Sequence, residues 1–280
     1  MSRVRSPSVA GQFYAGTAPG LREQIQSAFE HSVGPGAPPD VTDREASLVG
    51  LVSPHAGYPY SGPIAAHGFS RLAASGRPDV VVLIGPNHSA AGAPLAISGA
   101  SAWETPLGTA PVSDSLRDKL ADFPGLTIDE ATHAGEHSLE VQVPFLQYLY
   151  DDPVPILPIV MSRQNEATIE QLRAALSNAL TADRNAVLLA STDLTHYEPA
   201  PVAREQDGPI LDAISSLNAD PIVQAARSGH TMCGWGPTAS VLQASADLSA
   251  ETGTIRQYAT SGDTAGEPDS VVGYVSATLE

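Results

Sequence analysis

Five consecutive apolar residues, Val80-Val-Val-Leu-Ile84, constrain the fold of this chain more than any other feature. An uninterrupted apolar run of this length is typical of a β-strand that is covered on both faces, as in a parallel sheet between helices. Similar short runs occur along the whole chain, and Gly and Pro separate them. The further predicted strands are residues 48–52, 154–160, 186–190, 255–260 and 271–277.

Helical patterns lie between these runs. The predicted helices are residues 21–30, 63–74, 115–122, 166–180, 209–217 and 237–246. Strands that alternate with helices predict an α/β sandwich with a central, mostly parallel sheet. No shift in composition marks a boundary, so we expect one domain over residues 1–280, with residues 95–108 as a hairpin insertion.

Histidines follow three of the predicted strands at the point where each strand ends. His55 follows the run 48–52, His88 follows the run 80–84, and Asp193 and His196 follow the run 186–190. In open α/β sheets, ligands bind outside the carboxyl ends of the strands. One such histidine is usually an ordinary polar loop residue, but three at equivalent positions predict a shared pocket.

The single cysteine of the chain, Cys233, lies in a glycine-rich turn before a predicted helix. A lone cysteine is often an inert core residue. A thiol at a helix N-terminus has a lowered pKa, however, and a thiolate beside two imidazoles can bind zinc, iron or copper with a position left open. The residues alone leave both interpretations of Cys233 open.

The segment His133-Ala-Gly-Glu136-His137 spells an inverted zincin pattern. That mechanism needs both histidines on one face of a regular helix, and Gly135 lies between them. A metalloprotease is therefore not expected, and His137 and Glu140 are predicted to line the pocket or to hydrogen-bond to its ligands. Tyr58 is a further candidate for the pocket lining, with ordinary packing as the alternative.

Asp193 and His196 are candidates for an orienting carboxylate and an acid/base imidazole. A local Asx-turn with a surface histidine is the competing interpretation. Both interpretations place the two residues at the end of the same strand.

Taken together, these motifs resemble the Memo family, whose fold is that of the class III extradiol dioxygenases. The resemblance is carried in order by Pro54-His-Ala-Gly-Tyr58, Gly85-Pro-Asn-His88, Ser191-Thr-Asp-Leu-Thr-His-Tyr197 and Met232-Cys-Gly234, together with residues 5–14, 60–62, 103–108 and 136–145.

The resemblance implies a metal site on His55, His88 and Cys233, with Asp193 and His196 as catalytic residues. In the related dioxygenases the third ligand is a glutamate, and a thiolate in its place favours copper or iron, with zinc as a further candidate. The human relative is described as a copper-dependent redox protein and as a binder of phosphotyrosine segments. Prokaryotic members are commonly encoded beside a radical-SAM protein, which suggests a shared pathway.

The composition limits the partners. Asp and Glu number 31 against 14 Lys and Arg, a formal net charge of −17, and Lys119 is the single lysine. Such a negative field disfavours nucleic acid and anionic membranes as partners, and it suggests a halophilic, archaeal-like acidic proteome in a salt-rich cytoplasm. No run of about 18 apolar residues predicts a membrane span, and no apolar stretch follows Arg3 and Arg5, so we expect a cytoplasmic protein without a secretory signal.

Three functions fit these residues. The first is a copper- or iron-dependent redox enzyme that acts on a small molecule or on oxygen. The second is a non-catalytic module that binds a peptide or ligand in the same pocket, and the third is a hydrolase that uses zinc-activated water.

Overall fold

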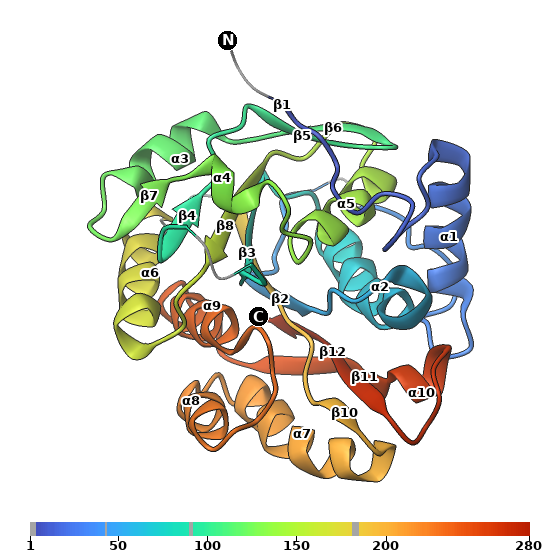
Figure 1. Cartoon of the computed structure of the whole chain (residues 1–280). Coiled ribbons are helices and arrows are strands. Elements are labelled where there is room, and N and C mark those ends of the chain that lie inside the picture. Colours follow the sequence, from blue (N-terminus) through green and yellow to red (C-terminus); the bar gives the residue numbers. More distant parts are fainter. Residues whose placement is uncertain (1–3, 43, 90–91, 181–184) are drawn as a thin grey trace.

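The protein is described by a computed structural model that covers residues 4–42, 44–89, 92–180 and 185–280. Its described strands form one large mixed sheet and one small sheet, with helices on both faces of the large one (Figure 1). In spatial order the large sheet contains β10 (His196–Glu198), β12 (Val271–Leu279), β2 (Gly50–Ser53), β9 (Ala186–Ser191), β3 (Val80–Pro86), β8 (Ile156–Met161), β4 (Leu95–Ile97) and β7 (Leu126–Ile128). The remaining strand of this sheet, β11 (Gly253–Thr260), pairs with β12 outside that order.

The four central strands, β2, β9, β3 and β8, are parallel, whereas β12 joins β2 and β4 joins β8 in antiparallel pairs. The run Val81–Ile84 of β3 is completely buried, as its uninterrupted apolar character predicts. The expected α/β class with a mostly parallel centre is therefore confirmed, and the antiparallel pairings lie toward the sides of the large sheet.

Two groups of helices cover the sheet. Helices α1 (Ala18–Glu30), α2 (Tyr58–Ser75) and α5 (Val143–Leu149) pack against one another, and α2 contacts β2 and β12. On the other side, α9 (Trp235–Asp247) crosses β9, β3 and β2 and packs on α6 (Glu166–Ala179) and α8 (Asp220–Arg227). The remaining helical elements are α3 (Asp114–Ala121), α4 (Glu130–His133), the 3₁₀ turn η1 (Glu140–Gln142), α7 (Ala200–Ser215) and α10 (Ser261–Thr264).

Helices α2 and α7 begin five and nine residues before their predicted starts. The sequence pattern predicts that they begin at Pro63 and Pro209, yet both prolines lie inside the helices. A proline inside a helix removes one backbone hydrogen bond, and the packing of the two helices on the sheet compensates for that loss. Helix α8 was not predicted.

The hairpin insertion expected at residues 95–108 is only partly correct. Leu95–Ile97 is β4 and belongs to the large sheet, where it pairs with β8. The hairpin itself consists of β5 (Ala102–Thr105) and β6 (Gly108–Pro111), and it forms the small sheet with the N-terminal strand β1 (Val4–Arg5). Across the described ranges, no helix combines the length and the apolar character that crossing a membrane requires. Residues 1–3, which include Arg3, lie outside the described residues.

Candidate metal centre

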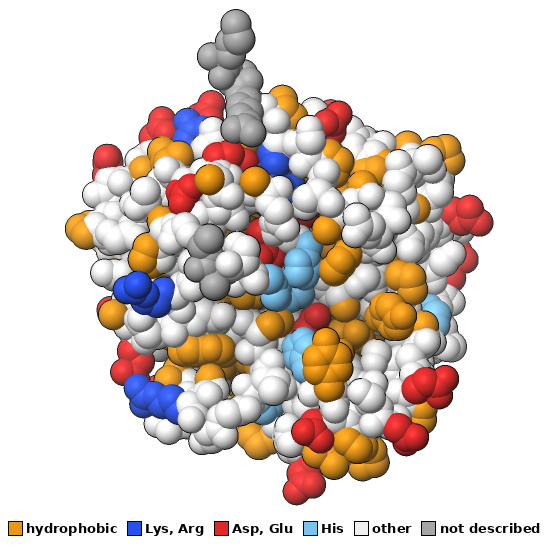
Figure 2. Space-filling model, in the orientation of Figure 1, with side chains coloured by type: hydrophobic (Ala, Val, Ile, Leu, Met, Phe, Trp, Pro, Cys, Tyr) orange, Lys and Arg blue, Asp and Glu red, His pale blue; other side chains and the backbone are white. Residues whose placement is uncertain are grey.

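The carboxyl ends of three neighbouring parallel strands bring the candidate residues together. Strands β2, β9 and β3 are adjacent, and His55, Asp193 and His88 follow them within two residues each. Histidine side chains gather near the centre of the face shown in Figure 2, with hydrophobic side chains beside them. The fold therefore brings His55, Asp193 and His88 to the same edge of the sheet.

Three imidazoles form the centre of the site. The ligand atoms of His55, His88 and His137 all lie within 4.8 Å of one another. The ring centroids of His88 and His137 are 4.4 Å apart, and that of His55 is 5.3 Å from His88. Two nitrogens bound to one metal ion are roughly 3–4 Å apart, so these three imidazoles are close enough that they could hold one ion.

Hydrogen bonds fix which nitrogen of His55 carries the ring proton. The hydroxyl of Ser191 donates to the carbonyl of Ser138 (2.6 Å), so its oxygen accepts from Nδ1 of His55 (2.9 Å) and from the amide of Gln142 (2.9 Å). Nδ1 therefore carries the ring proton, and Nε2 keeps its lone pair. His55 is buried, and burial together with the nearby His137 and His88 lowers its pKa, which keeps the ring neutral.

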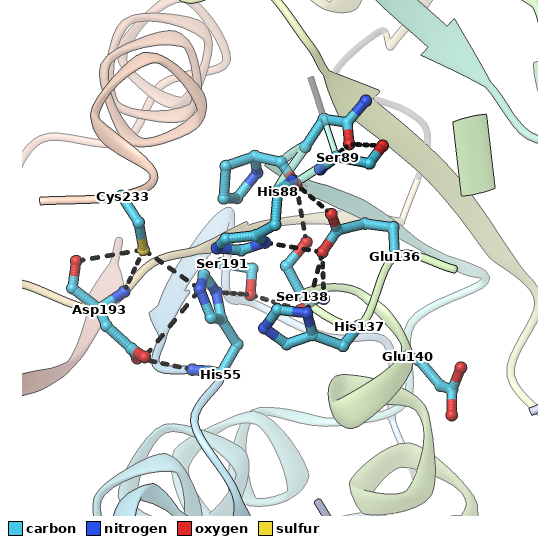
Figure 3. Close-up of polar contacts among 12 residues, drawn as sticks. His55, His88, Ser89, Glu136, His137, Ser138, Glu140, Ser191, Asp193 and Cys233 are labelled. Atoms are coloured by element: carbon cyan, nitrogen blue, oxygen red, sulfur yellow. Dashed lines mark hydrogen bonds and ion pairs between the residues drawn. The ribbon is translucent and has the colours of Figure 1, made fainter. Parts of the chain in front are cut away.

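Glu136 orients His88 in the same way. One carboxylate oxygen accepts from the backbone N–H of His88 (2.6 Å), and the other accepts from its Nδ1 (2.9 Å). Burial alone would lower the pKa of His88, but the hydrogen bond and the charge of Glu136 reverse the direction and raise it. The carboxylate is also 3.5 Å from Nδ1 of His137 (Figure 3). A carboxylate behind the histidines is the usual partner of metal-binding imidazoles.

Cys233 lies on the other side of His55 from His137 in Figure 3. Its Sγ is 3.1 Å from Nε2 of His55 and accepts a hydrogen bond from the backbone N–H of Asp193 (3.1 Å). The turn approaches β9 closely because residue 234 is glycine, since a Cβ there would collide with the carbonyl oxygen of Ser191. A sulfur and an imidazole nitrogen on one tetrahedral ion are about 3.5 Å apart, so the pair has a spacing that a shared ion can use.

Asp193 and His196 border this cluster. The Asp193 carboxylate accepts from the backbone N–H of His55 (2.8 Å), and its second oxygen is 4.0 Å from Nε2 of that ring. Burial raises the pKa of Asp193 to about 7. Nδ1 of His196 donates to the carbonyl of Leu194 (2.7 Å), which leaves Nε2 as a proton acceptor, and burial lowers the pKa of that ring.

Comparison with known proteins is consistent with these motifs. The family model described as Memo-like protein matches residues 5–278. A MEMO1 family protein of Methanopyrus kandleri is 42% identical over 275 residues, which cover 97% of each chain. Another, from Methanothermobacter thermautotrophicus, is 40% identical over 274 residues, which cover 97% of this chain and 98% of the relative. The chain belongs to the Memo family.

A solved structure adds support for the fold of this Memo protein. The crystal structure of an uncharacterized protein from Escherichia coli K12 superimposes with a TM-score of 0.58 and 18% sequence identity, covering 83% of this chain and all of the other. At this level of identity the similarity supports the shared α/β fold and nothing further.

Two predicted pocket residues of the Memo chain have other roles. Both carboxylate oxygens of Glu140 are occupied by the N-terminal segment, with Arg5 at 2.7 Å and further donors from Ser8, Val9 and Tyr14. Its side chain points away from the histidines (Figure 3). The hydroxyl of Tyr58 donates to the carbonyl of Val141 (2.7 Å) in the core. Neither residue lines the histidine cluster as predicted, because long-range packing orients both toward other partners.

The expected effect of the helix N-terminus on Cys233 is also wrong in sign. Cys233 does precede α9, but burial and the Asp193 carboxylate raise the pKa of its thiol. The desolvation penalty on the thiolate is larger than the stabilisation by nearby N–H groups.

The inverted zincin pattern separates in space, as expected. His133 ends the short α4, bonds to the carbonyl of Ala96 and meets Trp103 edge-on, so it lies apart from the metal-compatible group. His137 joins that group instead. The sequence patterns predicted no role for Glu136 or Ser191, although the Glu136-His137 pair was a usable signal for a carboxylate beside a metal-binding histidine.

Proposed function

We propose that this Memo protein holds one redox-active transition-metal ion at His55 and His88 and acts as an oxidoreductase on a small molecule or on oxygen. The observation that carries the proposal is the orientation of the rings. Ser191 and Glu136 engage Nδ1 of His55 and His88, so Nε2 is the atom of each ring that would bind an ion, and the sulfur of Cys233 lies 3.1 Å from Nε2 of His55. Unliganded surface histidines need no such paired support.

Two residues compete for the third position. His137 belongs to the compact imidazole cluster, whereas Cys233 places its sulfur beside Nε2 of His55. Imidazoles combined with a thiolate favour copper or iron over the hard cations Mg²⁺ and Ca²⁺. A redox-active ion at this position would supply electron exchange with the bound substrate.

The neighbouring groups are suited to proton transfer during that chemistry. Asp193, with a pKa of about 7, can hold or release a proton at its carboxyl group near neutral pH. His196 offers an unprotonated Nε2, because its Nδ1 is bound to a backbone carbonyl. We assign proton transfer to these two residues and ring orientation to Ser191 and Glu136.

The test is metal analysis of protein purified without oxygen, followed by oxygen consumption with a reductant. His55→Ala and His88→Ala are expected to lose the ion, and a comparison of His137→Ala with Cys233→Ser identifies the third ligand. The matched control is His67→Ala, because His67 does not belong to the metal-compatible group and its ring contacts the carbonyl of Val33. Unchanged metal content in all four site variants would refute the proposal.

The same measurements separate the alternatives. Zinc as the sole ion, without redox turnover, would favour hydrolysis by a zinc-activated water. A bound ion with no turnover under any tested condition would favour a non-catalytic binding module.

A further inference from the structure

A second group of buried polar residues lies behind the pocket and centres on Asp207 of α7. Asp207 is completely buried, and its Oδ1 accepts hydrogen bonds from the backbone N–H (3.0 Å) and the hydroxyl (2.7 Å) of Thr195. Its Oδ2 accepts from the hydroxyl of Tyr258 (2.7 Å). A carboxylate removed from water costs several kcal/mol unless such donors surround it, so a core built only for packing would not need one.

His230 completes the group. Its Nε2 is 3.2 Å from Oδ1 of Asp207 and 3.2 Å from the hydroxyl oxygen of Thr195. Its Nδ1 accepts from the backbone N–H of Met232 (3.1 Å). Because Nδ1 accepts this hydrogen bond, Nε2 is the donor atom of the ring, and it faces the hydroxyl oxygen of Thr195 with Oδ1 of Asp207 beside it.

This group connects the two segments that deliver site residues. Residues 193–196 carry Asp193 and His196, and residues 230–233 carry Cys233. Three hydrogen bonds join the segments directly. The backbone N–H of Cys233 donates to the Asp193 carbonyl (3.3 Å), and that of Asp193 donates to Sγ of Cys233 (3.1 Å). The backbone N–H of His196 donates to the hydroxyl of Thr231 (2.8 Å). Asp207 contacts both segments at once, through Thr195 on one and His230 on the other.

The fold makes room for this carboxylate. A Cβ at Gly273 of β12 would collide with Oδ2 of Asp207, so the strand has a residue without a side chain at the point of closest approach. Gly273 also exchanges backbone hydrogen bonds with Leu194 and Thr195, which places β12 directly beneath the segment.

We propose that Asp207 is a positioning residue of the pocket: through Thr195 and His230 it fixes the Cys233 turn against the Asp193–His196 segment. It touches none of the histidines of the metal-compatible cluster and acts only through the two segments. Its contribution to metal binding rests on the proposed function, whereas its effect on the Cys233 turn does not.

The experiment uses the fact that Cys233 is the sole cysteine of the chain. Alkylation of the full-length, metal-free protein by iodoacetamide therefore reports on this turn alone. In Asp207→Asn we expect alkylation about tenfold faster than in the wild type, because the amide cannot accept from all the donors that the carboxylate serves. Measuring the alkylation rate at a series of pH values distinguishes a change in the accessibility of the thiol from a change in its pKa.

Tyr258→Phe is the matched control. It removes one donor to the same carboxylate but leaves the contacts with Thr195 and His230, so we expect an alkylation rate within about twofold of the wild type. Equal effects of Asp207→Asn and Tyr258→Phe, or no effect of either, would show that Asp207 has a structural role only and overturn the proposal.

His230 provides a second route if Asp207→Asn does not fold. His230→Gln keeps an N–H that can reach Asp207 and is expected to resemble the wild type, whereas His230→Leu should show the faster alkylation. Equal rates in the two variants would also contradict the proposal.

Titration with Cu²⁺ and Fe²⁺ then measures the affinity of the same variants, with a loss of about tenfold or more expected for Asp207→Asn. If the wild type binds neither ion, the proposed function fails while the alkylation result still decides the role of Asp207.

Discussion

Replacing Asp193 by asparagine is expected to stabilise the metal-free protein at neutral pH. Asp193 is buried, and burial raises its pKa from 3.8 to about 7. Above pH 7 the folded protein therefore contains an ionised carboxylate in surroundings that oppose its charge. Asparagine has nearly the same shape, and its carbonyl oxygen can still accept the hydrogen bond from the backbone N–H of His55.

The pKa difference sets the magnitude. Each tenfold change in proton affinity is worth about 1.4 kcal/mol, so a rise from 3.8 to about 7 corresponds to about 4 kcal/mol. Between these two pH values the folded state binds more protons than the unfolded state, and the free energy of unfolding falls as the pH rises. We expect Asp193→Asn to be about 2–4 kcal/mol more stable at pH 8 and equal to the wild type near pH 3.5.

Urea denaturation of both proteins from pH 3.5 to pH 8, with a chelator present, measures this difference. Asp263→Asn is the matched control, and its expected change in stability has the opposite sign. Burial opposes ionisation of Asp263 too, but hydrogen bonds from Thr260 and the charge of Arg204 lower its pKa. That variant is expected to lose stability at neutral pH. If Asp193→Asn were no more stable than the wild type at pH 8, or if the difference did not vary with pH, the reasoning from burial would be refuted.

Three further results are expected. Arg5→Ala leaves Glu140 buried without its 2.7 Å partner and should lower the free energy of unfolding in urea by about 3–5 kcal/mol; a loss below about 1 kcal/mol would contradict this. Tyr197 has a left-handed backbone (φ 62°) and is 78% exposed, so Tyr197→Asn should raise the free energy of unfolding by up to about 1 kcal/mol. A decrease would show that the tyrosine side chain contributes more than the strain costs. The charge of −17 predicts a thermal midpoint that rises with KCl between about 0.1 and 1 M, and a flat response would argue against a salt-adapted chain.

Much of the site could be predicted from local sequence, for a simple physical reason. An apolar run such as Val80–Ile84 specifies a buried strand, and a chain that alternates strands with helices builds parallel neighbours. Because the carboxyl ends of parallel strands meet at one edge, the sequence patterns alone predict that His55, His88 and Asp193 lie close together. The family resemblance, which the comparisons confirm, added Cys233 to that group.

Other features depend on contacts between distant segments. Glu140 faces the N-terminal segment because Arg5, Ser8 and Tyr14 surround its carboxylate, and the local sequence around residue 140 contains no sign of them. The beginning of α2 before Pro63 likewise depends on its packing against β2 and β12. Local pattern cannot predict such features because the deciding partner lies far away in the chain.

Local sequence is enough to predict which strands end in histidine or aspartate and that these ends share one edge of the sheet. The protonation and hydrogen bonding of those groups depend instead on how distant segments pack. The pKa of Cys233 is raised because folding partly buries the thiol beside the Asp193 carboxylate, and that of Asp193 is close to neutrality because folding buries its side chain. Glu136 and Ser191 engage Nδ1 of His88 and His55, which leaves Nε2 as the atom that would bind an ion. Desolvation and hydrogen-bond partnership are properties of packing, and they exist only after the distant segments have come together.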